Sequence, residues 1–364
     1  MGEKTILAFA TKGSGTNDEH RLRALLSNLE TTLVPFDKGV KFTSFRKLLS
    51  TFRNTPPTLI VMEGTGIAGG IACLLARFLW GHRYVFSSGD AVGPFVGAHV
   101  WGLGIPFGLY ERMLCRYSAG FIGWTPYLVG RALTFGAPRG MTAAGWVLGQ
   151  NVSDLKTARR LVRALWGIRE ETIVFGLAGA IVRNKRRRYC YGLELVRAIR
   201  RVDRDDIAVV IIGDGTGLET LRREAGNDLG KRIFLPGSVP LDGVMESLCG
   251  FDVASLPQST DDVGAFRYTT KISEYQALKL PVLVSRIPAA YDLDEGQFIR
   301  LPGSAPWDPI FVKGIADYME RVTQPSLQRE IVPSVDHHDD TFSRETQVNR
   351  VTAFVKELFE EASW

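Results

Sequence analysis

Short apolar runs that end in glycine-containing turns and lead into helical stretches recur along this chain, and they constrain its fold more than any other feature. Residues 5–10 are the first run; a turn follows at residues 11–17, and residues 20–29 then carry leucines at helical spacing. The later runs are residues 58–62, 83–87, 121–125, 172–177, 207–212, 233–235, 253–256 and 282–285. Apolar strands that alternate with helices are typical of parallel sheets covered on both faces. We therefore expect an α/β protein with a Rossmann-like domain in each half.

The length of 364 residues agrees with two domains of about 100–200 residues each. We expect an N-terminal domain over residues 1–150 and a C-terminal domain over residues 151–340, joined by a hinge within residues 138–158. Residues 341–364 are expected to form a helix that packs back toward the N-terminal domain. That expectation rests on the apolar residues between 342 and 359, which are spaced for one helical face.

Charge and cysteine content narrow the function only slightly. A net charge of +5 suits anionic lipid, nucleic acid or phosphate-bearing substrates, and does not choose among them. The basic run 183–188 has no interleaved aromatic residues, which favours a solvated loop or phosphate neutralisation over nucleic-acid binding. None of the four cysteines has metal-ligand spacing and no secretory signal is present, so we expect reduced thiols and a cytoplasmic protein. Residues 337–340, His-His-Asp-Asp, are interpreted as a solvated loop rather than a metal site.

The segment 269–285 carries the strongest chemical signal. A helix is expected to begin near Thr270, which puts Lys271 in the first turn, where a cation opposes the helix dipole. The lysine makes sense if an anion occupies the helix N-terminus, since free amide groups and the ammonium would both point at it. Glu274, one turn further on, is placed to accept hydrogen bonds from two neighbouring ribose hydroxyls. Either charge taken alone is better explained by a solvated helix surface, because lone charges on helices are usually solvated.

This segment resembles the signature of retaining GT-B glycosyltransferases, in the form Pro-x-Lys-x-x-Glu-Tyr-x-Ala-x-x-x-Pro-Val-x-x-Ser. Upstream, residues 211–215, 234–239 and 251–253 match successive elements of that family in order, so the resemblance covers roughly residues 172–285. It implies the GT-B fold, two Rossmann-like domains facing each other across an interdomain cleft, with the donor nucleotide held by the C-terminal domain. The family's usual Glu-x7-Glu pair is reduced to a lone glutamate, because Phe266 stands eight residues before Glu274. The family's Gly-Arg after the first strand is Gly179-Ala180 here, with basic residues only from Arg183 on.

The resemblance and the turn positions together give a set of expected site residues. Asp90, which ends the third strand run, Arg267 and Lys271 are the expected catalytic residues. No metal site and no cofactor are expected, because the nucleoside diphosphate sugar is a substrate. The expected donor-binding residues are Gly13, Ser14, Gly15, Thr16, Gly179, Arg183, Gly213, Gly215, Ser238, Val239, Thr270, Lys271 and Glu274. For the loop 13–16 an ordinary tight turn, and for Asp90 a turn cap, are about equally good explanations.

The expected activity is that of a hexosyltransferase which moves a sugar from a nucleoside diphosphate sugar, with UDP favoured, to an acceptor, with retention and without a metal. A glycan or lipid-linked acceptor is expected, as in polysaccharide or glycolipid biosynthesis. The apolar segment 91–110, followed by Arg112 and Arg116, suits an acceptor site, a peripheral contact with the inner face of a membrane, or plain core. Two other functions stay open: a nucleotide-sugar epimerase on the same fold, and a non-catalytic sugar-nucleotide-binding subunit.

Overall fold

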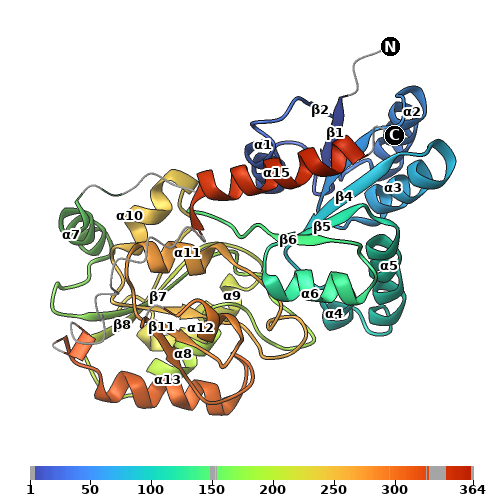
Figure 1. Cartoon of the computed structure of the whole chain (residues 1–364). Helices are drawn as coiled ribbons and strands as arrows, with labels where there is room; N and C mark the ends of the chain where they lie inside the picture. The colour runs from blue at the N-terminus through green and yellow to red at the C-terminus, as the bar shows by residue number, and fades with distance from the viewer. Residues whose placement is uncertain are drawn as a thin grey trace. The chain divides into compact units, whose positions relative to one another are not determined.

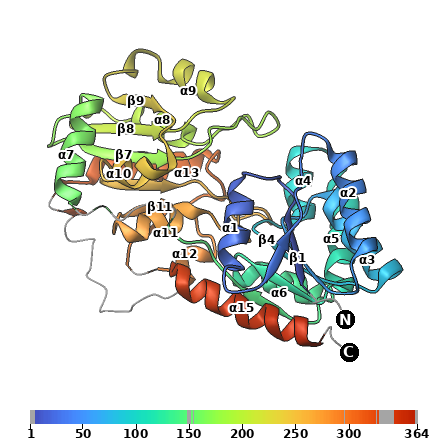
Figure 2. The same cartoon turned by 90° about the horizontal axis from the view of Figure 1, so that it is seen from above.

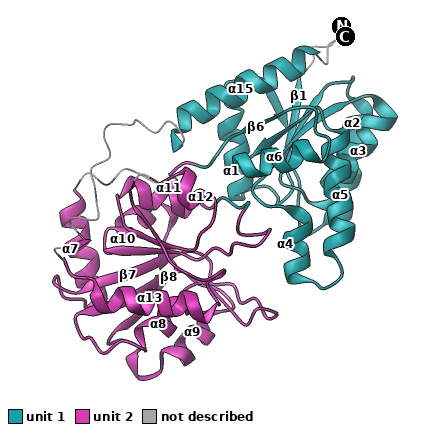
Figure 3. Cartoon of the chain, turned by 60° about the horizontal axis from the view of Figure 1, so that its bottom comes forward, with its two compact units in different colours: residues 1–145, 266–268, 339–364 teal, residues 146–265, 269–338 magenta. Residues whose placement is uncertain are grey.

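The structure, a computed structural model, describes residues 5–147, 152, 154–294, 296–324, 326–327 and 342–361. The chain forms two compact units (Figure 3). Unit 1 comprises residues 1–145, 266–268 and 339–364, and unit 2 comprises residues 146–265 and 269–338. The chain therefore passes from unit 1 to unit 2 inside the range expected for the hinge.

Unit 1 is built on a six-stranded sheet of order β2-β1-β3-β4-β5-β6, in which every pair is parallel. Its strands are β1 (Ile6–Ala10), β2 (Thr31–Leu33), β3 (Leu59–Glu63), β4 (Arg83–Ser88), β5 (Gly120–Gly123) and β6 (Gly140–Thr142). Its helices are α1 (Asn17–Leu25), α2 (Lys41–Asn54), α3 (Ile67–Trp80), α4 (Val92–His99), α5 (Gly104–Tyr117), α6 (Pro126–Thr134) and α15 (Arg344–Glu361). In Figure 2, α1 and α15 lie on one side of this sheet and α2, α3 and α5 on the other.

Unit 2 is built on a second six-stranded parallel sheet, of order β12-β11-β10-β7-β8-β9. Its strands are β7 (Ile173–Ala178), β8 (Ile207–Ile212), β9 (Ile233–Gly237), β10 (Val253–Leu256), β11 (Val282–Val284) and β12 (Phe298–Arg300). Its helices are α7 (Leu155–Trp166), α8 (Leu193–Ile199), α9 (Leu218–Ala225), α10 (Val244–Leu248), α11 (Thr270–Ala277), α12 (Ala289–Asp292) and α13 (Pro309–Arg321), with short 3-10 turns at Gly226–Asp228 and Leu241–Gly243. Helices α7, α10 and α11 appear on one side of the sheet and α8 and α13 on the other (Figure 1).

The central strands are buried along their whole length, which explains why they read as unbroken apolar runs. Strands β1, β3, β7 and β8 have no exposed residue. In unit 2 they pack against α8 and α13 in one continuous core that includes Phe175, Val209 and Phe311. The expected α/β fold with two Rossmann-like domains is thus confirmed.

One buried ionic cluster fixes α7 to the sheet of unit 2. The Arg163 side chain is fully buried and donates to the carbonyl oxygens of Gly250, Glu170 and Thr172 at 2.8–3.1 Å. It also pairs with Asp252, whose carboxylate accepts the backbone N–H of Val174 at 2.7 Å. Each polar group in this cluster therefore has a partner, as burial of charge requires.

Candidate functional site

Unit 2 contains a cavity of about 330 Å³ at the carboxyl ends of β7 and β8. The loops after β7, β8 and β9 line it, together with the start of α11. Seven of the expected donor residues line it together: Gly179, Gly213, Ser238, Val239, Thr270, Lys271 and Glu274. Ligands of open parallel sheets bind at this edge, so the cavity lies where an α/β protein of this type holds a nucleotide.

Two glycines allow the loops of this cavity to lie close together. Gly213 has a φ of +141°, and a Cβ added there would lie 2.0 Å from the carbonyl oxygen of Gly179. Gly179 itself has a φ of +148°, and its added Cβ would lie 2.7 Å from Nζ of Lys271. A side chain at Gly213 would collide with backbone, and one at Gly179 would push the lysine away. The glycines therefore bring Lys271 directly over the end of β7.

The first turn of α11 offers complementary charges. Thr269 is the N-cap residue and its side chain makes no cap bond to any described residue; the Ile272 amide donates to the Thr269 carbonyl oxygen at 3.1 Å. Lys271 also lies against the Tyr191 ring, with Nζ 5.2 Å from the centroid. Glu274 is buried, and desolvation raises the pKa of its carboxyl, while Lys271 and a hydrogen bond from Thr270 act to lower it. A cation at a helix N-terminus suits an anion, and a buried carboxylate suits hydroxyl groups.

Two of the expected donor residues of unit 2, Gly215 and Arg183, do not line this cavity. Gly215 has a φ of +144° and an added Cβ would lie 2.7 Å from the carbonyl oxygen of Ile181, so the glycine serves the packing of neighbouring loops. Arg183 is exposed, and its backbone N–H donates to Thr216 Oγ1 at 3.0 Å. Arg187, from the same basic run, does not line the cavity either and forms an ion pair with Asp261 at 3.2 Å.

The loop after β1, residues 13–16, caps its own helix. The Thr16 hydroxyl donates to the carbonyl oxygen of Gly13 at 2.7 Å and accepts the N–H of Glu19. The Gly15 N–H donates to the Glu19 carboxylate at 2.7 Å, and the Ser14 N–H to the carbonyl oxygen of Phe36. This is close to a capping box, with the Gly15 amide bound in place of that of the N-cap residue Thr16, so turn formation alone accounts for these residue types. A donor-binding role for residues 13–16 stays a prediction.

Asp90 and Arg267, the other two expected catalytic residues, lie together in unit 1. Arg267 Nε is 2.9 Å from Asp90 Oδ1 in an ion pair. The Arg267 guanidinium also lies over the Phe95 ring, at 5.7 Å. Arg267 was expected to act beside Lys271, yet the structure groups residues 266–268 with unit 1 and Lys271 with unit 2.

Unit 1 holds a second cavity, of about 880 Å³, at the carboxyl ends of β1, β3 and β4. Charged residues mark its sheet edge: Lys12, Asp18, Glu63, Asp90 and Arg267 all line it. Apolar residues from α2, α3, α4 and α5 form the rest of the wall, including Phe45, Ile71, Phe95 and Phe107. A cavity of this size with a few convergent polar groups is typical of small-molecule sites.

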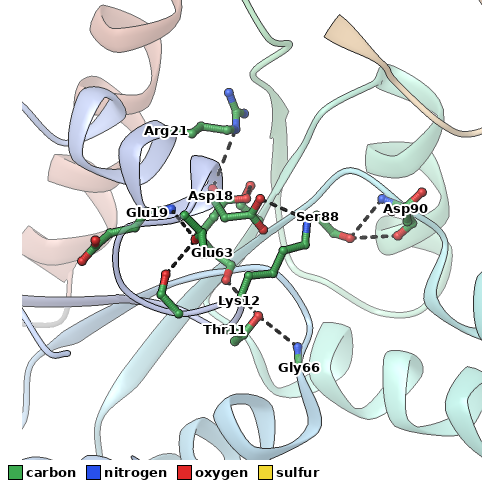
Figure 4. A network of polar contacts seen from close by, with 12 residues as sticks. Thr11, Lys12, Asp18, Glu19, Arg21, Glu63, Gly66, Ser88 and Asp90 are labelled. Carbon is green, nitrogen blue, oxygen red and sulfur yellow. Dashed lines mark hydrogen bonds and ion pairs between the residues drawn. The ribbon is translucent and has the colours of Figure 1, made fainter. Parts of the chain in front are cut away.

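Glu63, the last residue of β3, is the functional candidate that sequence reasoning missed. It is 1% exposed, and its Oε1 accepts hydrogen bonds from Ser87 Oγ at 3.0 Å and Trp124 Nε1 at 3.3 Å. Arg21 Nε is 3.8 Å from Oε2 (Figure 4). Desolvation raises the pKa of Glu63 to about 7; Arg21 and the two hydrogen bonds lower it, and Asp18 raises it. The available sequence signal was an acid at the end of an apolar strand, followed by Gly-Thr-Gly.

The described residues show neither a metal cluster nor a membrane-spanning helix. They contain no group of three or more His, Cys, Asp or Glu side chains placed to hold a metal ion. The His-His-Asp-Asp segment, residues 337–340, lies outside the described residues. Among the helices that the structure describes, none is long and apolar enough to cross a membrane.

Comparison with known proteins bears on both units. Residues 172–305 match the family model of the group 1 glycosyl transferases. No curated protein sequence matches the chain. HepE of Anabaena, solved with UDP and glucose, has a similar structure, with 15% identity over 98% of this chain and 96% of that one and a TM-score of 0.61.

Two further solved structures are similar over almost the whole chain. Sucrose-phosphate synthase of Thermosynechococcus elongatus has 13% identity over 98% of this chain and 97% of its own, with a TM-score of 0.64. A structure described as a UDP-N-acetylglucosamine 2-epimerase of Listeria monocytogenes has 16% identity over 99% and 98%, with a TM-score of 0.56. At these identities the likeness shows the fold. Residues 172–305 are therefore a group 1 glycosyltransferase domain, and the chain that carries this domain is a glycosyltransferase with the GT-B fold.

Proposed function

We propose that the protein transfers a hexose from a nucleoside diphosphate sugar, with UDP as the favoured nucleotide, to a hydroxyl of a glycan or lipid-linked acceptor, with retention of configuration. The observation that carries this proposal is the unit 2 cavity, where seven expected donor residues meet inside the group 1 domain. Lys271 and the amides of α11 receive the diphosphate, and Glu274 binds the ribose. The bound nucleotides of HepE and of a Staphylococcus aureus protein of similar fold, both UDP, support the choice of base.

The chemistry at this cavity is electrostatic. When the diphosphate leaves, negative charge develops on its oxygens. The Lys271 ammonium and the helix amides stabilise that charge from fixed positions, which is the most effective form of catalysis by preorganised groups. We assign no metal and no cofactor to this step, because the protein cation takes the place of a divalent ion. Asp90 and Arg267 stay candidates for contacts with the sugar or the acceptor.

Donor binding is tested by thermal shift with UDP-, GDP- and ADP-sugars, since a ligand that binds the native state raises Tm. We expect UDP-sugars to give the largest shift. Lys271→Ala should lower turnover by about a hundredfold or more with an unchanged fold, the usual effect of removing one charge-stabilising group. Lys231→Ala, an exposed lysine of the same unit, is the matched control. Wild-type turnover in Lys271→Ala, at both limiting and saturating donor, would refute the assignment.

An epimerase is the second candidate, because proteins of that activity share this fold. The two activities differ in what they need: an epimerase converts the donor alone, whereas a transferase needs the acceptor. Proton NMR of a UDP-sugar incubated with the enzyme separates them. A new sugar nucleotide without acceptor would establish the epimerase, and nucleotide binding without any turnover would establish a binding subunit. In the transfer reaction, the same spectra report retention through the anomeric coupling of the product.

Peripheral contact with a membrane is the second part of the proposal, and the hairpin of α4 and α5 supports it. Glycines let the two helices touch: a Cβ added to Gly93 would lie 2.8 Å from Gly108 Cα. The tip of the hairpin exposes large apolar side chains, with Trp101 85% and Ile105 78% exposed. Arg112 and Arg116 follow on α5, which suits acidic lipid headgroups.

Flotation with liposomes that contain acidic phospholipid tests this contact. We expect the wild-type protein to float, and Trp101→Ser combined with Ile105→Ser to reduce the floating fraction several-fold. Leu165→Ser is the control, because Leu165 is 82% exposed and belongs to unit 2. Equal flotation of the double variant and the control would show that the hairpin tip makes no membrane contact, and a location at the inner face of a membrane would be dropped.

A further inference from the structure

Glu63 has a carboxylate oxygen that no described group satisfies. Its Oε1 accepts two hydrogen bonds, but Oε2 is buried without any hydrogen-bond partner among the described residues. A buried acceptor left unsatisfied costs free energy on the order of 1–3 kcal/mol, and such groups in native proteins mark a functional or ligand-binding position. Glu63 lines the unit 1 cavity, so its carboxylate lies at the wall that a bound molecule would contact.

The neighbouring cation does not neutralise Glu63 at hydrogen-bonding distance. Arg21 donates to the carbonyl oxygens of Ala143 and Ala144, at 2.6 and 3.1 Å, and its guanidinium lies 4.5 Å from the centroid of the Trp124 ring. Its Nε approaches Oε2 only to 3.8 Å. Asp18, the other charged neighbour, is held by Lys12 at 3.0 Å. The cluster therefore fixes the position of the carboxylate, while Oε2 has the Arg21 ion pair and accepts no hydrogen bond from the described residues (Figure 4).

Most of the remaining cavity wall is apolar, and Lys38 and Lys41 are the further charged residues that line it. Phe45, Phe95 and Phe107 are half-buried in it, and Ile67 and Ile71 at the start of α3 expose 47% and 39% of their surface. A hydrated sugar would leave this apolar wall in contact with water. An apolar group would cover it, and burial of apolar surface contributes about 25 cal/mol of binding free energy per Å². The volume of about 880 Å³ is enough for an apolar body together with a polar end.

We infer that the unit 1 cavity binds an amphipathic acceptor, with the Glu63 carboxylate accepting a hydrogen bond from an acceptor hydroxyl and the wall of α2, α3 and α4 holding an apolar aglycone. This inference rests on the proposed transferase function, whose acceptor it defines. It makes Glu63 an acceptor-contacting residue, and Ser87 and Trp124 positioning residues that hold its other oxygen. Acceptors that lack either the hydroxyl or the apolar body bind weakly.

Equilibrium dialysis with n-octyl β-D-glucoside below its critical micelle concentration tests the inference on the full chain without donor. At about pH 8, above the pKa of about 7 that burial gives Glu63, we expect binding to the wild type, no comparable binding of glucose, and about a tenfold loss in Glu63→Gln, the size expected for a hydrogen bond to a charged group. Ile71→Ser should weaken binding about fivefold, whereas Leu133→Ser, a similarly exposed residue outside the cavity, should not. Ile71→Ser keeps the inference testable if Glu63→Gln fails to fold, because its side chain is exposed.

The outcomes separate this inference from the proposed function. Octyl glucoside that binds Glu63→Gln and Ile71→Ser as tightly as the wild type would overturn the inference, as would glucose binding equal to that of octyl glucoside. UDP should still bind Glu63→Gln, and octyl glucoside should still bind Lys271→Ala. Loss of UDP binding in the wild type itself would refute the donor assignment and leave the dialysis result unaffected. A purely structural Glu63 would change stability but not the preference for octyl glucoside over glucose.

Discussion

Replacing Glu63 with glutamine should change how the stability of unit 1 depends on pH. The folded protein holds the Glu63 proton more tightly than the unfolded chain does, because burial raises its pKa from 4.5 to about 7. Stability from this group is therefore fully present below pH 4.5 and is lost as the pH rises through about 7. Glutamine carries no charge at either pH, so the variant lacks this loss. It still offers one carbonyl oxygen to Ser87 and Trp124.

The size of the effect follows from the shift. One pKa unit corresponds to about 1.4 kcal/mol, so the penalty approaches about 3 kcal/mol once the pH exceeds both pKa values. At about pH 5 the unfolded glutamate is already partly ionised and the penalty is about 1 kcal/mol. Between about pH 5 and about pH 8, the wild type should thus lose roughly 2–3 kcal/mol relative to Glu63→Gln.

Urea denaturation at the two pH values measures this difference. The two units need not unfold together, so the transition of unit 1 is identified by hydrogen exchange of peptides from β3 and β4. Glu219→Gln is the control, since Glu219 is 81% exposed on its side chain and lies in unit 2. A stability difference between wild type and Glu63→Gln that is the same at both pH values would refute the reasoning, because it would mean that Glu63 ionises normally in the folded protein.

Two further predictions concern the framework of unit 2. Arg163→Met should lower the unfolding free energy of unit 2 by about 3–5 kcal/mol, because the Asp252 carboxylate loses its buried partner. Arg160→Met, an exposed change on the same helix, should alter it little. Equal Tm values for the two variants would contradict this prediction. Gly213→Ala should abolish UDP binding and lower Tm, because its Cβ would lie 2.0 Å from the Gly179 carbonyl oxygen. A variant with wild-type Tm and UDP affinity would show that the two loops can separate at no cost.

Sequence reasoning predicted the fold well where strands are buried on both faces. Strands β1, β3, β7 and β8 carry their own signal, since each residue along them except Glu63 at the end of β3 is apolar or small. The three-residue strands at the edges, β2, β6 and β12, were missed because so few residues cannot show a period. Helices such as α2 and α13 lie outside the apolar runs and the motif on which the predicted elements rested.

The two cavities differ in how much of their content the sequence could supply. In unit 2 the donor residues belong to one ordered motif, so a linear pattern located most of the cavity. In unit 1 the corresponding residues, among them Lys12, Glu63 and Asp90, follow three different strands with no fixed spacing. Only the strand order β1-β3-β4 brings them to one edge. Arg267 shows the same limit, since its place in unit 1 beside Asp90 depends on the path of a long loop.

The contrast between the cavities argues that donor and acceptor recognition can be changed separately. The unit 2 cavity is small and offers a cation, helix amides and a buried carboxylate, which are groups for a phosphate and a ribose. The unit 1 cavity is larger and mostly apolar, with Glu63 at its polar end. No residue lines both cavities among those that the structure describes. Changes at residues without shared partners are close to additive, so Lys271→Ala and Glu63→Gln should lower the affinities for UDP and for octyl glucoside independently. A double variant whose losses depart from that additivity by more than a factor of about two to three would mean that the two ligands are coupled through the protein.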